Sequence, residues 1–266
     1  FWLKNLFFAS LVRVLASWSS RSRRIFTSSG KAKGKARRRP GKMPHLSFNE
    51  SINPDLKLGK KVETDATPES AVSESMPLAY KWTYWEQPSR EDKDYSELTQ
   101  KVLDFSTVQE FWKFYGQVPQ PSMLLGKRLT REQPDGVLAG IDSIMIFRDG
   151  IRPEWEDKVN ATGGHFQFQL KPDVGGAQLD EYWNNLVLGI IGSGIAPASM
   201  ITGIRLVDKL SETRGAKVVR IEVWFSNRED AQAVAALKKN VEKCMAKHLD
   251  GSEGQAPWCA TKNHSR

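Results

Sequence analysis

The sequence is poor in the side chains from which disulfide frameworks and metal sites are built. Its 266 residues include two cysteines, Cys244 and Cys259, which are too few for a disulfide framework. The four histidines show no metal-ligand spacing; they are His45, His165, His248 and His264. We therefore expect no metal, no cofactor and a reducing compartment, which is the cytoplasm with the nucleus as a second location.

Long apolar runs and catalytic motifs are also missing. No apolar run reaches the roughly 18–20 residues that a membrane-spanning helix needs. No Gly-rich phosphate loop precedes a helix, because Gly189, Gly192 and Gly194 come where a helix ends. No nucleophile and base stand in a familiar arrangement, so a nucleotide hydrolase is the weaker alternative. The sequence predicts a protein without a transmembrane helix that is not an enzyme.

Acidic residues are absent from the first 42 positions, which hold twelve Lys or Arg. The chain begins with Phe1, and its first methionine is Met43. Three interpretations compete for residues 1–42: an organellar presequence, a signal peptide, or upstream sequence translated in frame before a start at Met43. We favour the third, because a short apolar run followed by the basic stretch 31–39 does not fit a signal cleavage pattern.

The other 224 residues carry 27 basic and 31 acidic groups, a net charge of −4. Any affinity for RNA must then come from a local basic patch. Residues 43–76 are polar and poor in aromatics, which predicts a disordered leader. We expect one ordered domain over residues 77–249, with a surface loop at about 116–140, and a disordered tail over 250–266.

Hydrophobic periodicity predicts three helices within this domain. The first covers residues 105–115, where Thr107 and Glu110 have the spacing of a capping box. The second carries an apolar stripe from Leu179 to Ile190. The third begins after Asn227 as N-cap and runs to about residue 249.

Alternating residues predict strands over 80–85, 143–147, 164–170, 201–210 and 217–225. In the last strand, Arg220 and Trp224 fall on the face opposite the core, and Lys209 falls on the same face of the preceding strand. A Trp and several cations therefore line one non-core surface.

The stretch from Gly150 to Asp157 sets Trp155 beside Glu156 between two of these strands. An indole face can stack on a cationic ring, which is worth about 0.5–2 kcal/mol. The adjacent carboxylate can accept two parallel N–H bonds from the edge of the same ring. A cationic purine such as 7-methylguanine fits both groups. The ordinary alternative is that Trp155 is a core aromatic after a turn and Glu156 is solvated.

Several motifs in one order resemble a known family. They are Pro77-Leu78, Thr107-Val108, Phe111-Trp112, Trp155-Glu156-Asp157, Gly163-Gly164, Leu179-Asp180 with Trp183, and Trp224. From about residue 77 to 249 the chain resembles the eukaryotic translation initiation factor 4E family of mRNA cap-binding proteins. The resemblance implies an α+β fold, in which a curved antiparallel sheet of about eight strands carries three helices on its convex face. It also implies translation initiation and capped mRNA as the partner. The sequence is silent on oligomeric state, for which a monomer is the default.

The resemblance assigns cap-binding residues on the concave face. Trp155 and an aromatic residue after the first strand sandwich the methylated base; that residue is usually Trp and is Tyr95 here, whose smaller ring weakens the cation–π contact. Glu156 accepts from the guanine edge, and Trp224 lies against the N7-methyl group. The residues assigned to bind the phosphates are Lys209, Arg214, Lys217 and Arg220. His165 stands at a position that is often basic in the family.

The resemblance also implies a site on the convex face for a helical peptide of the scaffold factor 4G or of 4E-binding proteins. The matching positions are Pro77, Val108, Trp112, Asn184, Leu188 and Gly192. Asn184 replaces a usual Leu, which removes an apolar anchor worth about 1–3 kcal/mol if buried. Two alternatives therefore stay open: a cap-binding translational repressor with weak scaffold binding, and a partner-binding module with a disabled cap pocket.

Overall fold

A computed structural model of the chain describes residues 45–54, 75–89, 98–133, 136–210 and 217–264. The chain divides into two units, residues 1–44 and residues 45–266. The first unit lies outside the described residues, which all belong to the second.

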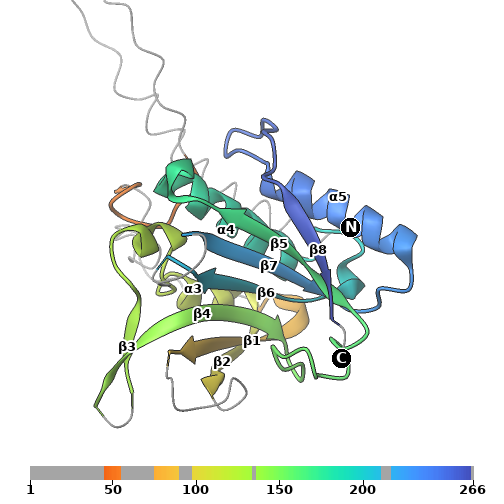
Figure 1. The fold of residues 1–266 in the computed structure, drawn as a ribbon, viewed down its shortest axis with the longest axis horizontal. Coiled ribbons are helices and arrows are strands. Elements are labelled where there is room, and N and C mark those ends of the chain that lie inside the picture. Colours follow the sequence, from red (N-terminus) through yellow and green to blue (C-terminus); the bar gives the residue numbers. More distant parts are fainter. Residues whose placement is uncertain (1–44, 55–74, 90–97, 134–135, 211–216, 265–266) are drawn as a thin grey trace, which may run out of the picture. The chain divides into compact units, whose positions relative to one another are not determined.

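The described residues form one antiparallel sheet with the strand order β2-β1-β4-β6-β7-β5-β8, and β3 pairs with β4 beside this path (Figure 1). The strands are β1 (Pro77–Pro88), β2 (Gln100–Thr107), β3 (Thr130–Glu132), β4 (Leu138–Arg148), β5 (Gly164–Leu170), β6 (Ile201–Asp208), β7 (Val219–Phe225) and β8 (Cys259–Asn263).

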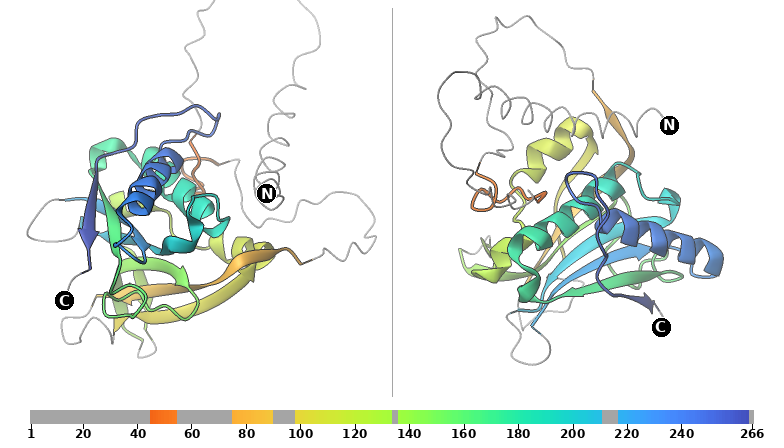
Figure 2. Two further views of the ribbon diagram at one scale, coloured as in Figure 1. Left: turned by 90° about the vertical axis from the view of Figure 1, so that its right-hand side faces the viewer. Right: turned by 90° about the horizontal axis from the view of Figure 1, so that it is seen from above.

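Three α-helices in the described part of the chain lie on the same side of the curved sheet, as Figure 2 shows from two directions. They are α3 (Val108–Tyr115), α4 (Gly176–Ile191) and α5 (Ala231–Met245). The short 3₁₀ segments are η1 (Pro121–Leu125), η2 (Pro172–Val174) and η3 (Ala198–Met200). The fold class predicted from the sequence, an eight-stranded curved sheet with three helices on one face, is confirmed.

The core lies between the sheet and the helices, where the apolar stripes meet. Leu186 and Val187 of α4 and Ile204 and Ile221 of the central strands are fully buried. Burying one such side chain contributes about 1.5–3 kcal/mol. The strand alternation therefore leaves the opposite face of β6 and β7 free to carry polar and aromatic groups.

The helix starts follow local capping chemistry, with two corrections to the sequence predictions. At Thr107 both halves of the capping box with Glu110 are formed, so α3 begins at residue 108 and not at 105. The N-cap of α5 is Asp230, whose carboxylate accepts from the Ala233 amide at 2.9 Å. The prediction of Asn227 as N-cap was wrong, because Asn227 has a positive φ of 55° and its side chain accepts from Glu229 instead.

Both outermost strands, β2 and β8, were missed by the sequence analysis. β2 is mostly exposed, so it shows little apolar alternation. The predicted disordered tail contains β8, which pairs with β5 from Phe168↔Cys259 to Gly164↔Asn263. The predicted surface loop 116–140 contains η1, β3 and the start of β4. Part of the predicted disordered leader, residues 45–54, packs on the helices.

Candidate functional site

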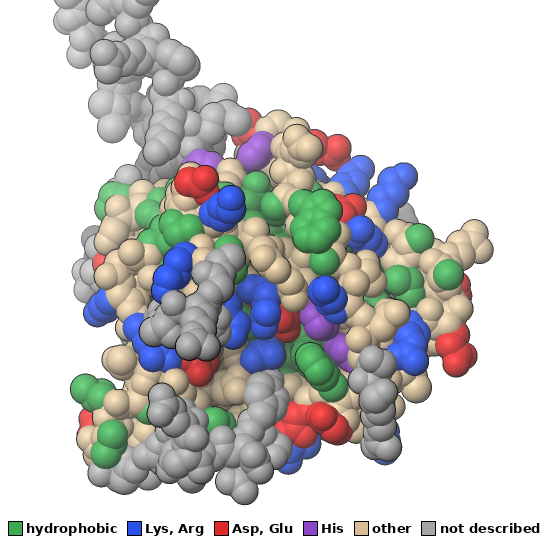
Figure 3. Space-filling model, in the orientation of Figure 1, with side chains coloured by type: hydrophobic (Ala, Val, Ile, Leu, Met, Phe, Trp, Pro, Cys, Tyr) green, Lys and Arg blue, Asp and Glu red, His purple; other side chains and the backbone are tan. Residues whose placement is uncertain are grey.

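The open face of the sheet carries a recessed aromatic cluster. Met145, Phe147 and Trp224 are buried there, and Trp85 and Ile151 pack against them. Figure 3 views the molecule from this face: Lys and Arg side chains gather over its middle, with histidine side chains beside them. The non-core surface predicted from the strand pattern therefore combines aromatic and cationic groups, as expected.

Trp155 stands on the loop between β4 and β5 and is 54% exposed. Asp157 closes this loop, because its carboxylate accepts from the backbone amides of Arg152 at 3.0 Å and Val159 at 2.9 Å. The buried Asn160 amide donates to the carbonyls of Arg152 at 2.8 Å and Glu154 at 3.0 Å. These four bonds fix the loop without using Trp155 or the exposed Glu156. The interpretation of Trp155 as a core aromatic is therefore wrong.

His264, directly after β8, joins the Trp155 loop to the sheet face. Its ring lies nearly parallel to Trp155, with centroids 5.9 Å apart and an interplanar angle of 18°. It also lies 4.4 Å from the Trp224 ring. Its Nδ1 is 2.9 Å from the Asn160 carbonyl oxygen, and its Nε2 is 2.9 Å from Nδ1 of His165. His165 in turn stacks on Trp224 at 5.6 Å.

Burial lowers the pKa of both histidines of this pair. It lowers the pKa of His165 to about 4, and the neighbouring His264 and Arg220 act in the same direction. Burial also lowers the pKa of His264, against the opposing pull of the Glu222 and Glu156 carboxylates. His165 was predicted to replace a basic residue near the phosphates. In the structure the His165 ring is buried and packed on Trp224.

Glu222 lies between the aromatic cluster and the cations. Burial alone would raise its pKa, but Arg205, His165 and Arg220 hold the pKa of Glu222 below its ordinary value. Its carboxylate accepts from Trp224 Nε1 at 3.0 Å and lies 2.8 Å from Arg220 Nε. Arg205 approaches it at 3.8 Å. One carboxylate thus faces two guanidinium groups, and the cluster keeps a net positive charge.

The predicted phosphate-binding residues lie toward the turn of the β6–β7 hairpin. Arg220 and Trp224 are four residues apart on one face of β7, a separation of roughly 13 Å. Lys209 is half-buried, and its amide donates to the Val218 carbonyl at 3.1 Å. Lys217 is exposed just before β7. Two predicted residues, Tyr95 and Arg214, lie outside the described residues.

The Gly163-Gly164 pair is explained by close backbone packing at the start of β5. A Cβ on Gly163 would come within 1.8 Å of the Phe225 carbonyl oxygen, and one on Gly164 within 2.4 Å of the Lys262 carbonyl oxygen. Only glycine lets β5 approach β7 and β8 this closely. This approach brings His165 and His264 together over Trp224.

The six residues predicted for the convex face have different surroundings. Pro77 is exposed, Val108 and Leu188 are 6% and 8% exposed, and the Gly192 amide donates to the Leu188 carbonyl. Trp112 meets the ring of Phe48 edge-on at 6.0 Å. Asn184 is fully buried, and its side chain is bonded to three polar groups. Sequence reasoning missed Phe48 and His264, since both lie in segments whose composition is typical of disorder.

Together these features define an α+β domain with an aromatic cluster and neighbouring cations on the open face of one curved sheet. The sequence model of the family described as eukaryotic initiation factor 4E matches residues 77–255. The chain belongs to this family. Membership in a family of initiation factors agrees with the prediction that the protein is not an enzyme.

Individual relatives give the same result. Eukaryotic translation initiation factor 4E of Saccharomyces cerevisiae is 34% identical over 168 residues, which is 60% of this chain and 68% of the relative. Factor 4E-2 of Schizosaccharomyces pombe is 32% identical over 163 residues, which is 61% of this chain and 58% of that relative. The matched part of the chain therefore covers 68% of the first relative and 58% of the second.

Solved structures share the fold. Ascaris suum eIF4E-3 in complex with the m2,2,7G cap matches with a TM-score of 0.53 at 22% identity, covering 64% of this chain and 84% of that one. C. elegans eIF4E-3 in complex with the 4E-binding protein Mextli matches with a TM-score of 0.52 at 19% identity, covering 64% and 87%.

Proposed function

We propose that this protein binds the 7-methylguanosine end of capped mRNA on the open face of its sheet and acts in translation initiation in the cytoplasm. The observation that carries the proposal is the half-exposed Trp155, held on a closed loop beside Glu156 and joined through the His264 ring to Trp224. The relatives named as initiation factors and the neighbour solved with a cap support it.

In this proposal the methylated base stacks on Trp155. The positive charge of the base is attracted to the indole face, and the stack contributes about 0.5–2 kcal/mol. Glu156 accepts the two N–H bonds of the guanine edge, and each such bond to a charged group contributes about 1.5–3 kcal/mol. Guanine without the N7-methyl group lacks the positive charge, so the site prefers the methylated form.

The phosphates extend along β7 toward the hairpin turn in this proposal. The roughly 13 Å between Trp224 and Arg220 is enough for a triphosphate to run from the base to the cations. Arg220 is partly neutralised by Glu222, so we assign further phosphate contacts to Lys209 and Lys217. The affinity for the triphosphate should then fall as salt concentration rises.

The convex face takes a helical peptide of the scaffold factor 4G or of a 4E-binding protein in the same proposal, through Trp112 and Leu188. A neighbour solved with a 4E-binding protein supports this assignment. The buried Asn184 favours the second candidate role, a cap-binding repressor that recruits the scaffold weakly, since it offers a peptide no apolar anchor.

A fluorescence titration of the full chain with 7-methyl-GTP and with GTP tests the cap site. We expect a preference for the methylated nucleotide, and a loss of at least about tenfold in affinity in both Trp155→Ala and Glu156→Ala. Trp258→Ala is the matched control, because Trp258 is 75% exposed and lies outside the pocket. Equal affinity for the two nucleotides, or full affinity in both pocket variants, would contradict the proposal.

A further inference from the structure

A short N-terminal segment of the chain, residues 45–54, lies on the convex face against α3 and α4. Within it, Leu46 is 3% exposed and Ser47 is fully buried. The ring of Phe48 packs edge-on against Trp112 at 6.0 Å and Tyr115 at 5.9 Å. This degree of burial shows a docked segment, which we call the N-terminal strap.

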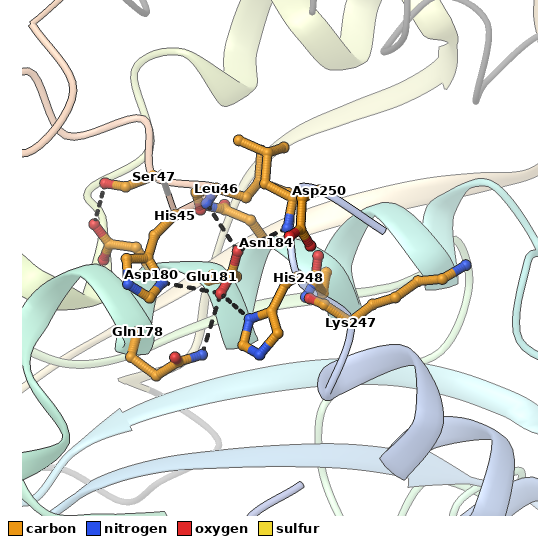
Figure 4. A network of polar contacts seen from close by, with 12 residues as sticks. His45, Leu46, Ser47, Gln178, Asp180, Glu181, Asn184, Lys247, His248 and Asp250 are labelled. Carbon is orange, nitrogen blue, oxygen red and sulfur yellow. Dashed lines mark hydrogen bonds and ion pairs between the residues drawn. The ribbon is translucent and has the colours of Figure 1, made fainter. Parts of the chain in front are cut away.

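The Glu181 carboxylate on α4 fastens one end of the strap. It accepts from the Leu46 amide at 3.2 Å and lies 3.0 Å from Nδ1 of His45. From the other side it accepts from the Leu249 amide at 3.2 Å and lies 3.1 Å from Nδ1 of His248. Figure 4 shows His45 and His248 converging on this carboxylate. One buried acid thus ties the strap to α4 and to the turn after α5.

Asp180, the preceding residue of α4, holds the middle of the strap. Its carboxylate accepts from the Ser47 hydroxyl at 2.5 Å and from the Ser122 hydroxyl of η1 at 2.7 Å. The Asn49 side chain donates to the same Ser122 hydroxyl at 2.7 Å. The strap is therefore bonded to two elements of the convex face.

Asn184 completes the docking site. Its amide nitrogen donates to the Leu46 carbonyl at 2.8 Å and to the Gln120 side-chain oxygen at 2.8 Å. Its amide oxygen accepts from the Tyr115 hydroxyl at 2.7 Å. A Leu at this position would remove all three of these bonds from a buried place. The polar side chain therefore fits the backbone of the strap and not an apolar partner residue.

Trp112 and Asn184 are two of the positions assigned above to a helical partner peptide. From this overlap we infer that the N-terminal strap occupies the partner-binding surface of its own chain, and that a helical partner must displace it to bind. The inference rests on the proposed partner site. A partner then binds only the fraction of molecules in which the strap is released, so its apparent affinity is reduced by that fraction.

The test measures binding of a synthetic 4G-derived helical peptide to the full chain by calorimetry. In Phe48→Ala the strap loses its ring contacts with Trp112 and Tyr115, and we expect the peptide to bind about tenfold more tightly, a change of about 1.4 kcal/mol. Phe48→Leu keeps an apolar side chain, and we expect a smaller gain. Glu50→Ala is the matched control, because Glu50 is exposed on the same segment. Thermal unfolding of each variant checks that it folds.

Hydrogen exchange supplies the second measurement. When the peptide is added to the unsubstituted chain, we expect amides of residues 46–49 to exchange faster while α3 becomes more protected. Equal peptide affinity in all variants, with residues 46–49 still protected in the complex, would overturn the inference and leave the partner site in place. If neither the unsubstituted chain nor any variant binds the peptide, the proposed partner site is refuted, and the inference that rests on it is refuted as well.

Discussion

The His264 side chain offers a sharp test of how the pocket is held together. Replacing it by Ala removes two ring contacts, with Trp155 and Trp224, and two hydrogen bonds, to Asn160 and His165. Each ring contact is worth about 0.5–1.5 kcal/mol and each hydrogen bond about the same. The free energy of unfolding should therefore fall by about 2–6 kcal/mol.

The effect of His264→Ala on ligand binding is smaller, because Trp155 is 54% exposed whereas Trp224 is 1% exposed, so only the contact with Trp155 orients an accessible ring. Losing about 0.5–1.5 kcal/mol of that contact corresponds to a roughly 2- to 12-fold weaker affinity for 7-methyl-GTP. Urea unfolding and a fluorescence titration measure the two quantities on the same sample. His264→Phe keeps a ring and should recover most of the affinity, whereas Lys262→Ala, an exposed change on β8, should alter neither.

Unchanged affinity in His264→Ala would refute the idea that this ring positions Trp155. A tighter affinity would refute it in another way, by showing that the imidazole fills space that the base needs.

Two further predictions concern stability. The unfolded chain protonates His165 near its ordinary pKa of 6.5, but the folded chain does so only at about 4. The free energy of unfolding should therefore fall by about 3 kcal/mol as pH drops from about 6.5 to about 4. Urea unfolding of His165→Asn should not show this decrease in the free energy of unfolding over the same pH range. Gly163→Ala should lower the free energy of unfolding by more than about 3 kcal/mol, because its Cβ meets a backbone carbonyl that cannot move aside. Gly126→Ala is its control, since the nearest atom would be at an ordinary 3.7 Å, and equal unfolding midpoints in the two variants would contradict the packing argument.

The sequence predicted the central strands and the helices because their side chains repeat with a clear period. β6 and β7 alternate core and pocket residues, and α4 carries one continuous apolar stripe. The edge strands β2 and β8 gave no such signal, since an edge strand that is largely exposed does not need apolar residues at every second position. Missing β8 also meant missing His264.

The amino-acid sequence by itself determined the family, the arrangement of sheet and helices, and the pairing of Trp155 with Glu156, because neighbours in the chain carry these features. The roles of Tyr95 and Arg214 stay predictions. Only the tertiary structure decided where single polar residues point. From the sequence alone, Asn184 indicates the loss of an apolar anchor. In the fold its side chain donates to the carbonyl of Leu46, a residue 138 positions away. Hydrogen bonds between segments so far apart depend on the packing of the helices and leave no local pattern in the chain.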